Sequence, residues 1–272
     1  MLDHANPKAR PLVVESIFLA AVVACALCIA ALAPANAYAA GTKSAWVVTT
    51  QTTKYTGDNG SVVVAKYGYK DGLITSYKWI DKFDGQRSTH QYKYTYDKKF
   101  RITKETEKNN GKTFAQKVKF TYNKKGYLVK RVSTPKGSDA KYASKYSYNS
   151  KGQLTKTAAT FGANKYFYDA KGNVKTKKED SAETGHSTMK YSYDAKGNLT
   201  KQQDSYNLAT YTNTYEGSRL VKRVGYDENG KKASVTTYKY KKVTAPKAAS
   251  KLVKSQQKWI INEILPFYSC HC

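Results

Sequence analysis

Residues 168–174, Tyr-Asp-Ala-Lys-Gly-Asn-Val, and residues 193–199, Tyr-Asp-Ala-Lys-Gly-Asn-Leu, are the clearest copies of a phrase that recurs along this 272-residue chain. The copies begin at Tyr69, Tyr96, Tyr122, Tyr148, Tyr168, Tyr193, Tyr215 and Tyr240. A repeat every 20 to 27 residues is typical of proteins built as a row of similar units, each contacting its neighbours. The phrase therefore predicts a repeat protein.

Each phrase predicts a β-hairpin. An acid or amide follows the tyrosine, and the glycine three positions later suits the left-handed residue that closes such a turn. The clearest structural copies begin at Tyr122, Tyr148, Tyr168 and Tyr193 and are closed by Gly126, Gly152, Gly172 and Gly197. Three hairpins are expected to be irregular: Phe100 replaces the glycine, Gly217 comes early, and Asp71-Gly72 predicts a two-residue type I′ turn.

A three-residue loop pairs each leading tyrosine with the aliphatic residue six positions later. The predicted pairs are Tyr96–Ile102, Tyr122–Leu128, Tyr148–Leu154, Tyr168–Val174 and Tyr193–Leu199. One step further from the turn, Tyr146 is expected to face Lys156, and Tyr191 to face Lys201, with the ammonium over the ring. The candidate binding residues are Tyr146, Tyr166, Tyr191, Tyr238, Lys156 and Lys201. The same rings are alternatively the core of a coiled sheet.

The chain as a whole predicts an all-β fold, an antiparallel hairpin meander of about fifteen short strands. We expect a single-layer or gently coiled elongated sheet, with an N-terminal signal helix and a short C-terminal helix. The expected segments are a signal peptide (1–39), an N-terminal strand or capping segment (40–61), the repeats (62–243), and a linker with helix and tail (244–272). Apolar residues recur at helical spacing over 248–265, which predicts a helix that caps the last strand or, alternatively, inserts into a membrane.

These phrases, above all Tyr-Asp-Ala-Lys-Gly-Asn-Leu-Thr-Lys at 193–201, resemble the YD or RHS repeats of bacterial surface and toxin proteins. The consensus of that family is close to Tyr-Asp-x-x-Gly-Arg-Leu, and the resemblance covers about residues 62–243. It implies arrays that coil into a β-sheet shell around a toxin, closed by a C-terminal core segment. This chain has far fewer repeats and no recognisable core segment or toxin domain, so the resemblance implies the repeat fold without the cargo role.

The first forty residues indicate export. Lys8 and Arg10 precede an apolar run over 17–33, and cleavage is expected after Ala39. An uncleaved anchor, or a lipoprotein at Cys25, is the alternative. We therefore expect a secreted or cell-surface protein.

The mature chain keeps only two cysteines, in Cys270-His271-Cys272. Structural zinc sites usually need two separated ligand pairs, so this tail is interpreted as exposed, with intermolecular disulfides or a metal site as alternatives. We expect no metal and no cofactor.

The charge is strongly basic, with 47 basic residues against 20 acidic ones and a formal net charge of +27. Lysines on sheet surfaces keep sheets from pairing with one another. They also attract polyanions such as wall teichoic acids, acidic glycans or anionic lipids. Only six of the basic residues are arginines, and together with export and the even spread of lysine this disfavours nucleic-acid binding.

Catalytic motifs are absent from the sequence: there is no G-x-S-x-G, H-E-x-x-H or phosphate-binding glycine loop. We therefore expect a non-enzymatic, exported protein that binds a glycan or an anionic envelope polymer through a sheet rich in tyrosine and lysine. Membrane contact is expected only through the signal segment before cleavage, and the oligomeric state is left open. The alternative is a passive structural or spacer component of the envelope, or a remnant of an RHS-type shell without cargo.

Overall fold

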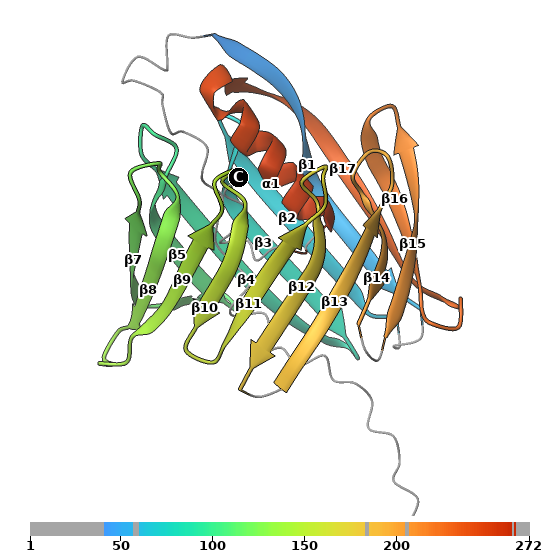
Figure 1. The fold of residues 1–272 in the computed structure, drawn as a ribbon, viewed down its shortest axis with the longest axis horizontal. Helices are drawn as coiled ribbons and strands as arrows, with labels where there is room; N and C mark the ends of the chain where they lie inside the picture. The colour runs from blue at the N-terminus through green and yellow to red at the C-terminus, as the bar shows by residue number, and fades with distance from the viewer. Residues whose placement is uncertain (1–40, 57–59, 183–184, 205–206, 263, 265–272) are drawn as a thin grey trace, which may run out of the picture.

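A computed structural model describes residues 41–56, 60–182, 185–204, 207–262 and 264. The predicted signal helix, its cleavage site and Cys270-His271-Cys272 lie outside the described residues. The described chain forms one antiparallel sheet of seventeen strands, followed by a 3-10 turn and a helix (Figure 1). The predicted all-β class is confirmed.

The elements are β1 (Thr42–Tyr55), β2 (Val62–Lys70), β3 (Leu73–Phe83), β4 (Gln86–Tyr96), β5 (Ile102–Asn109), β6 (Lys112–Phe114), β7 (Gln116–Tyr122), β8 (Leu128–Pro135), β9 (Tyr142–Tyr148), β10 (Leu154–Ala159), β11 (Gly162–Tyr168), β12 (Val174–Ser181), β13 (Gly185–Tyr193), β14 (Leu199–Gln203), β15 (Leu208–Glu216), β16 (Arg219–Tyr226), β17 (Lys232–Pro246), η2 (Lys247–Ala249) and α1 (Ser250–Asn262).

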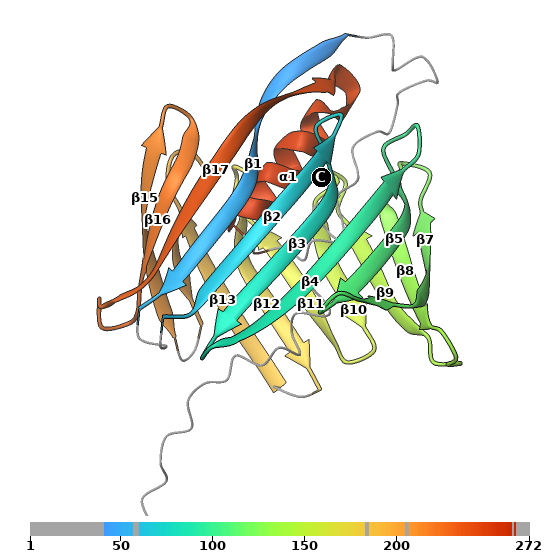
Figure 2. The same ribbon diagram turned by 180° about the vertical axis from the view of Figure 1, so that it is seen from behind.

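The sheet coils until its ends meet. Apart from β6 and β7, strands that follow one another in sequence pair with each other, and β1 lies between β17 and β2. The segment expected to cap one end of an open stack therefore joins the last strand to the second. Among the described residues, no ladder connects β7 to β5 or β6, so the nearly closed shell has one seam (Figures 1 and 2).

Seven of the eight tyrosine phrases form the predicted hairpins, all at one end of the shell. The hairpin predicted after Tyr240 is wrong, because β17 continues through that phrase to Pro246 and no glycine is there to close a turn. The four predicted turn glycines have φ between +79° and +85°, a region that suits a residue without Cβ. In the turn that contains Gly172, the Asp169 carboxylate accepts a hydrogen bond from the Asn173 backbone N–H at 2.8 Å. Phe100 adopts φ +60° in the glycine position, and Asp71 and Gly72 both have positive φ, as the expected irregular turns require.

Just beyond the turns, the five predicted tyrosine–aliphatic pairs are confirmed. After each pair the register shifts by one residue, which is a β-bulge. Between Leu154 and Lys156 this shift places Thr157, not Lys156, opposite Tyr146. Gln202, not Lys201, likewise lies opposite Tyr191. The predicted pairing of these lysines with the rings is wrong, because the extra residue of the bulge turns each lysine to the opposite face of the sheet.

Helix α1 lies across the tyrosine-hairpin end of the shell, enclosed by strands on both sides (Figures 1 and 2). It packs against β17, as predicted, and also against β1 and β3. The Gln256 side-chain oxygen accepts the Ile74 backbone N–H at 3.1 Å. At the far end of the helix, the Asn262 side-chain oxygen accepts the Leu199 N–H at 3.1 Å. The helix therefore ties together strands that are distant in sequence.

Candidate binding surfaces

The leading tyrosines form a hydrogen-bonded ladder on the inner face of the sheet. The Tyr148 hydroxyl donates to the backbone carbonyl of Leu128, the aliphatic residue of the preceding phrase, at 2.9 Å. The same bond recurs in seven copies, at 2.5 to 2.9 Å, from Tyr69, Tyr96, Tyr122, Tyr148, Tyr168, Tyr193 and Tyr240. Six of these bonds fasten a phrase to the one before it, and the bond from Tyr69 to the Val48 carbonyl fastens the first phrase to β1. This explains why tyrosine and aliphatic residue recur together.

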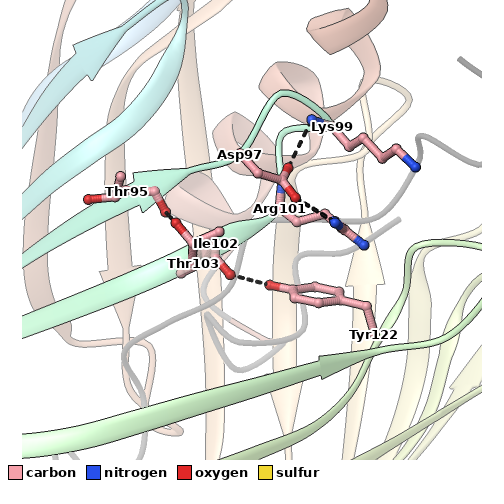
Figure 3. A network of polar contacts seen from close by, with 7 residues as sticks. All are labelled: Thr95, Asp97, Lys99, Arg101, Ile102, Thr103 and Tyr122. Carbon is pink, nitrogen blue, oxygen red and sulfur yellow. Dashed lines mark hydrogen bonds and ion pairs between the residues drawn. The ribbon is translucent and has the colours of Figure 1, made fainter. Parts of the chain in front are cut away.

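Figure 3 shows one rung of this ladder beside its turn. The Tyr122 hydroxyl donates to the Ile102 carbonyl at 2.9 Å. Asp97 accepts the backbone N–H groups of Lys99 and Arg101, each at 2.9 Å, and pairs with the Arg101 guanidinium at 2.7 Å. That guanidinium also lies 5.3 Å from the centre of the Tyr122 ring. This rung crosses the seam between β5 and β7, so side chains hold the shell where the backbone ladder is missing.

One phrase departs from the ladder. The Tyr215 hydroxyl donates to the Asp194 carboxylate instead of to a backbone carbonyl. The side-chain amide of Asn213 donates to the Leu199 carbonyl at 3.1 Å in its place. Burial raises the pKa of Asp194, but hydrogen bonds from Tyr215 and Asn198 outweigh this effect and hold the pKa below its ordinary value. Burial and the Asp194 carboxylate raise the pKa of Tyr215 to about 12.

The four tyrosines predicted to bind a ligand are buried. Tyr146, Tyr166, Tyr191 and Tyr238 are each at most 8 % exposed and belong to the hydrophobic core. Burial raises the pKa of Tyr166 and of Tyr191 well above 10. Their inward position follows from the alternation of side chains along a strand, since each stands two residues before a ladder tyrosine. A polymer at the outer surface does not reach these rings.

The lysines of the prediction lie on the other face. Lys156 is exposed, and it pairs across the ladder with Lys165, which pairs in turn with Lys178 on the next strand. We call these three residues the lysine row. Lys130 and Lys145 make a further lysine pair of this kind on β8 and β9. Neither arrangement has an acidic residue directly opposite its lysines.

An exposed aromatic ring lies beside the lysine row. Phe167 is 47 % exposed, two residues after Lys165 on β11, and the Lys178 ammonium lies 5.8 Å from the centre of its ring. Ring and ammonium groups therefore occur together on the outer face, although not through the residues that the sequence indicated. The missed signal was Lys-x-Phe in strands whose neighbours also carry lysine.

A pocket of about 420 Å³ opens at the tyrosine-hairpin end, between the turns that follow Tyr122 and Tyr148. It is lined by Asn123, Lys124, Lys125, Tyr127, Val129, Tyr146, Ser147, Tyr148 and Asn149. The centres of the Tyr127 and Tyr148 rings are 5.0 Å apart. Tyr127 also fills the space beside Gly152, where a Cβ would meet its hydroxyl. Lysine, amide and phenol groups thus converge at this end of β7–β10.

Other chemistry is limited in the part of the chain that the structure describes. No group of three or more histidine, cysteine or acidic side chains is placed to hold a metal ion there. None of the helices within those residues is long and apolar enough to cross a membrane. A buried ion pair joins Glu105 to Arg131 at 2.7 Å across the seam.

Comparisons with known proteins give a likeness of fold. No protein-family model and no curated protein matches the chain, so the YD or RHS resemblance stays a prediction without support from them. A porin-like protein from Bacteroides uniformis matches over 71 % of this chain and 98 % of its own, with 11 % identity and a TM-score of 0.52. At that identity the likeness concerns sheet architecture alone.

Two weaker likenesses support no further argument. A porin-like protein from Bacteroides vulgatus covers 71 % of this chain and 98 % of its own, with 13 % identity and a TM-score of 0.34. The structure of TcdB2-TccC3-TEV matches over 65 % of this chain and 11 % of its own, with 15 % identity and a TM-score of 0.33.

Proposed function

We propose that this is an exported, non-enzymatic repeat protein of the cell surface or extracellular space that binds an anionic envelope polymer through the outer face of its sheet. The observation that carries the proposal is the lysine row. Like charges directly opposite each other on neighbouring strands destabilise a sheet. Lys156, Lys165 and Lys178 nevertheless stand in register on three adjacent strands. Bound anions would offset that repulsion.

Protection against edge-to-edge pairing does not account for these lysines. Charged residues serve that purpose on edge strands, whose backbone groups are unpaired. The row lies on β10, β11 and β12, each of which is paired on both sides. A passive spacer has no need of like charges in the middle of a sheet, so this observation favours binding over the purely structural alternative.

The proposed ligand is a phosphate- or carboxylate-bearing polymer. An extended polyanion lying across the strands meets one ammonium on each, at strand spacings of about 4.8 Å. Phe167 adds an exposed ring to the same face, and Lys124 and Lys125 at the pocket extend the basic surface to the hairpin end.

The test is the affinity of the chain 40–272 for polyphosphate at physiological salt. A variant with Lys156→Gln, Lys165→Gln and Lys178→Gln removes the row. If each lysine contributes about 1 kcal/mol near an anionic surface, the variant binds about 100-fold more weakly. Lys136→Gln, Lys151→Gln and Lys171→Gln form the matched control, since they remove the same charge from exposed turns. Equal losses in both variants, or no binding by the wild type, contradict the proposal.

A further inference from the structure

The end of the shell opposite the tyrosine hairpins carries its own set of exposed aromatic rings. Three strands end there on an aromatic residue: β1 on Tyr55, β3 on Phe83 and β6 on Phe114. Strand β9 begins there with Tyr142. Their exposed fractions lie between 42 % and 57 %. An isolated exposed ring is ordinary, but four on neighbouring hairpins at one end form a surface that needs an explanation. We call these four residues the aromatic rim.

The aromatic rim faces the inside of the shell. Phe83 lies six residues after Tyr77 on β3, and side chains an even number of residues apart on a strand share a face. Tyr77 packs against Trp259 of α1 inside the shell. Tyr142 likewise shares a face with the buried Tyr146. Tyr55 shares a face with Gln51, whose side chain accepts the hydroxyl of the buried Tyr67. Helix α1 lies across the other end of the shell, so these rings stand at the end that the helix leaves open (Figures 1 and 2).

Each ring of the aromatic rim has a polar group directly across the ladder. Tyr55 pairs with Ser234, and Phe83 pairs with Gln86. Phe114 pairs with Glu107, and Tyr142 pairs with Ser133. A flat apolar surface beside hydroxyl, amide and carboxylate groups matches a sugar ring, whose faces are apolar and whose edge carries hydroxyls. Acyl chains would instead leave these polar groups without hydrogen bonds in hydrocarbon, which is costly.

We propose that the aromatic rim binds a polysaccharide chain by stacking sugar rings on these side chains, as a second site that does not depend on the lysine row. Tyr55 and Phe83 lie on β1 and β3 with β2 between them. Two strand spacings amount to about 9.6 Å, which is close to the disaccharide repeat of an extended β-1,4-linked chain. Two sugar rings one repeat apart in such a chain therefore meet Tyr55 and Phe83. Stacking on a neutral sugar is insensitive to salt, in contrast to binding by lysine.

The test uses cellohexaose and chitohexaose as neutral β-1,4-linked probes, with binding measured by calorimetry on the chain 40–272 at 0.15 M and 1 M salt. The variant combines Phe83→Ala, Phe114→Ala and Tyr142→Ala. Trp46→Ala is the control, because Trp46 is 46 % exposed near the other end of β1. We expect at least one probe to bind equally at both salt concentrations, and the triple variant to lose about tenfold or more in affinity while the control does not.

Three outcomes overturn this inference. They are no binding of either hexasaccharide by the wild type, unchanged binding in the triple variant, and binding that collapses at 1 M salt. Vesicles containing anionic lipid form a separate arm, because Lys54, Lys82 and Lys141 adjoin three of the rings. Vesicle binding that the triple variant abolishes, with no hexasaccharide binding, assigns the rim to lipid instead. The far-ultraviolet spectrum and melting temperature of each variant confirm folding, and polyphosphate affinity reports separately on the proposed function.

Discussion

The hydroxyl ladder predicts a specific energetic cost for removing single oxygen atoms. In Tyr148→Phe the ring stays in place while the bond to the Leu128 carbonyl, at 2.9 Å, is lost. In Tyr193→Phe the bond to the Val174 carbonyl, at 2.7 Å, is lost. Both rings are half-buried and pack against the core, so each carbonyl is poorly placed to find water in exchange. The expected loss is about 1 kcal/mol in the free energy of unfolding for each change.

The two sites are far enough apart that their costs should add, to about 2 kcal/mol in the double variant. Urea unfolding monitored by circular dichroism measures this, provided that the slope with denaturant is unchanged. Tyr142→Phe is the matched control, because that ring is 45 % exposed and its hydroxyl makes no ladder bond to any of the described residues. It should change stability by less than about 0.5 kcal/mol. Ladder variants that are as neutral as this control would refute the role of the hydroxyls.

Three further predictions concern turns, the seam and pH. Gly152→Ala should destabilise the fold by more than Gly230→Ala, since both have positive φ but only at Gly152 would the new Cβ meet a side chain; differential scanning calorimetry compares them. Glu105→Ala, which leaves Arg131 buried without this carboxylate, should cost about 3–5 kcal/mol in urea unfolding, and Glu105→Ala with Arg131→Met should recover part of it. The pKa of Asp194 is lower in the folded state than the ordinary value of 3.8 that applies in the unfolded chain. The stability that its charge supplies is therefore fully present above pH 3.8 and is lost as the pH falls through the folded-state pKa. Asp194→Asn should therefore flatten the acid limb of the stability curve, and an unchanged curve would contradict this.

Local pairing could be read from the sequence, whereas the sides of the sheet could not. The six-residue offset from Tyr148 to Leu154 sets the pairs beside each turn, because a glycine-closed loop of known length fixes the register there. The repeat pattern does not show the bulge that follows, so the sequence assigned Lys156 to the wrong face. Only the structure shows that Lys156 stands in register with Lys165.

Closure of the shell was likewise beyond the sequence pattern. The pairing of β1 with β17 joins residues about 190 positions apart, and nothing in the repeat period specifies it. The helix was predicted from its apolar spacing, but the hydrogen bonds of Gln256 and Asn262 to distant strands were not. These long-range contacts decide which surfaces remain open, and hence where the candidate sites lie.

The most direct test of the central claim, that the lysine row binds an anionic polymer, is the salt dependence of polyphosphate affinity. Each ammonium–phosphate contact with a single-stranded polyanion contributes about 0.7 to the slope of log K against log salt. Removing Lys156, Lys165 and Lys178 should therefore reduce the magnitude of the slope by about 2, while the matched turn-lysine variant keeps the wild-type slope. Identical slopes for the wild type and both variants would show that the row makes no contact with the polymer and would contradict the account.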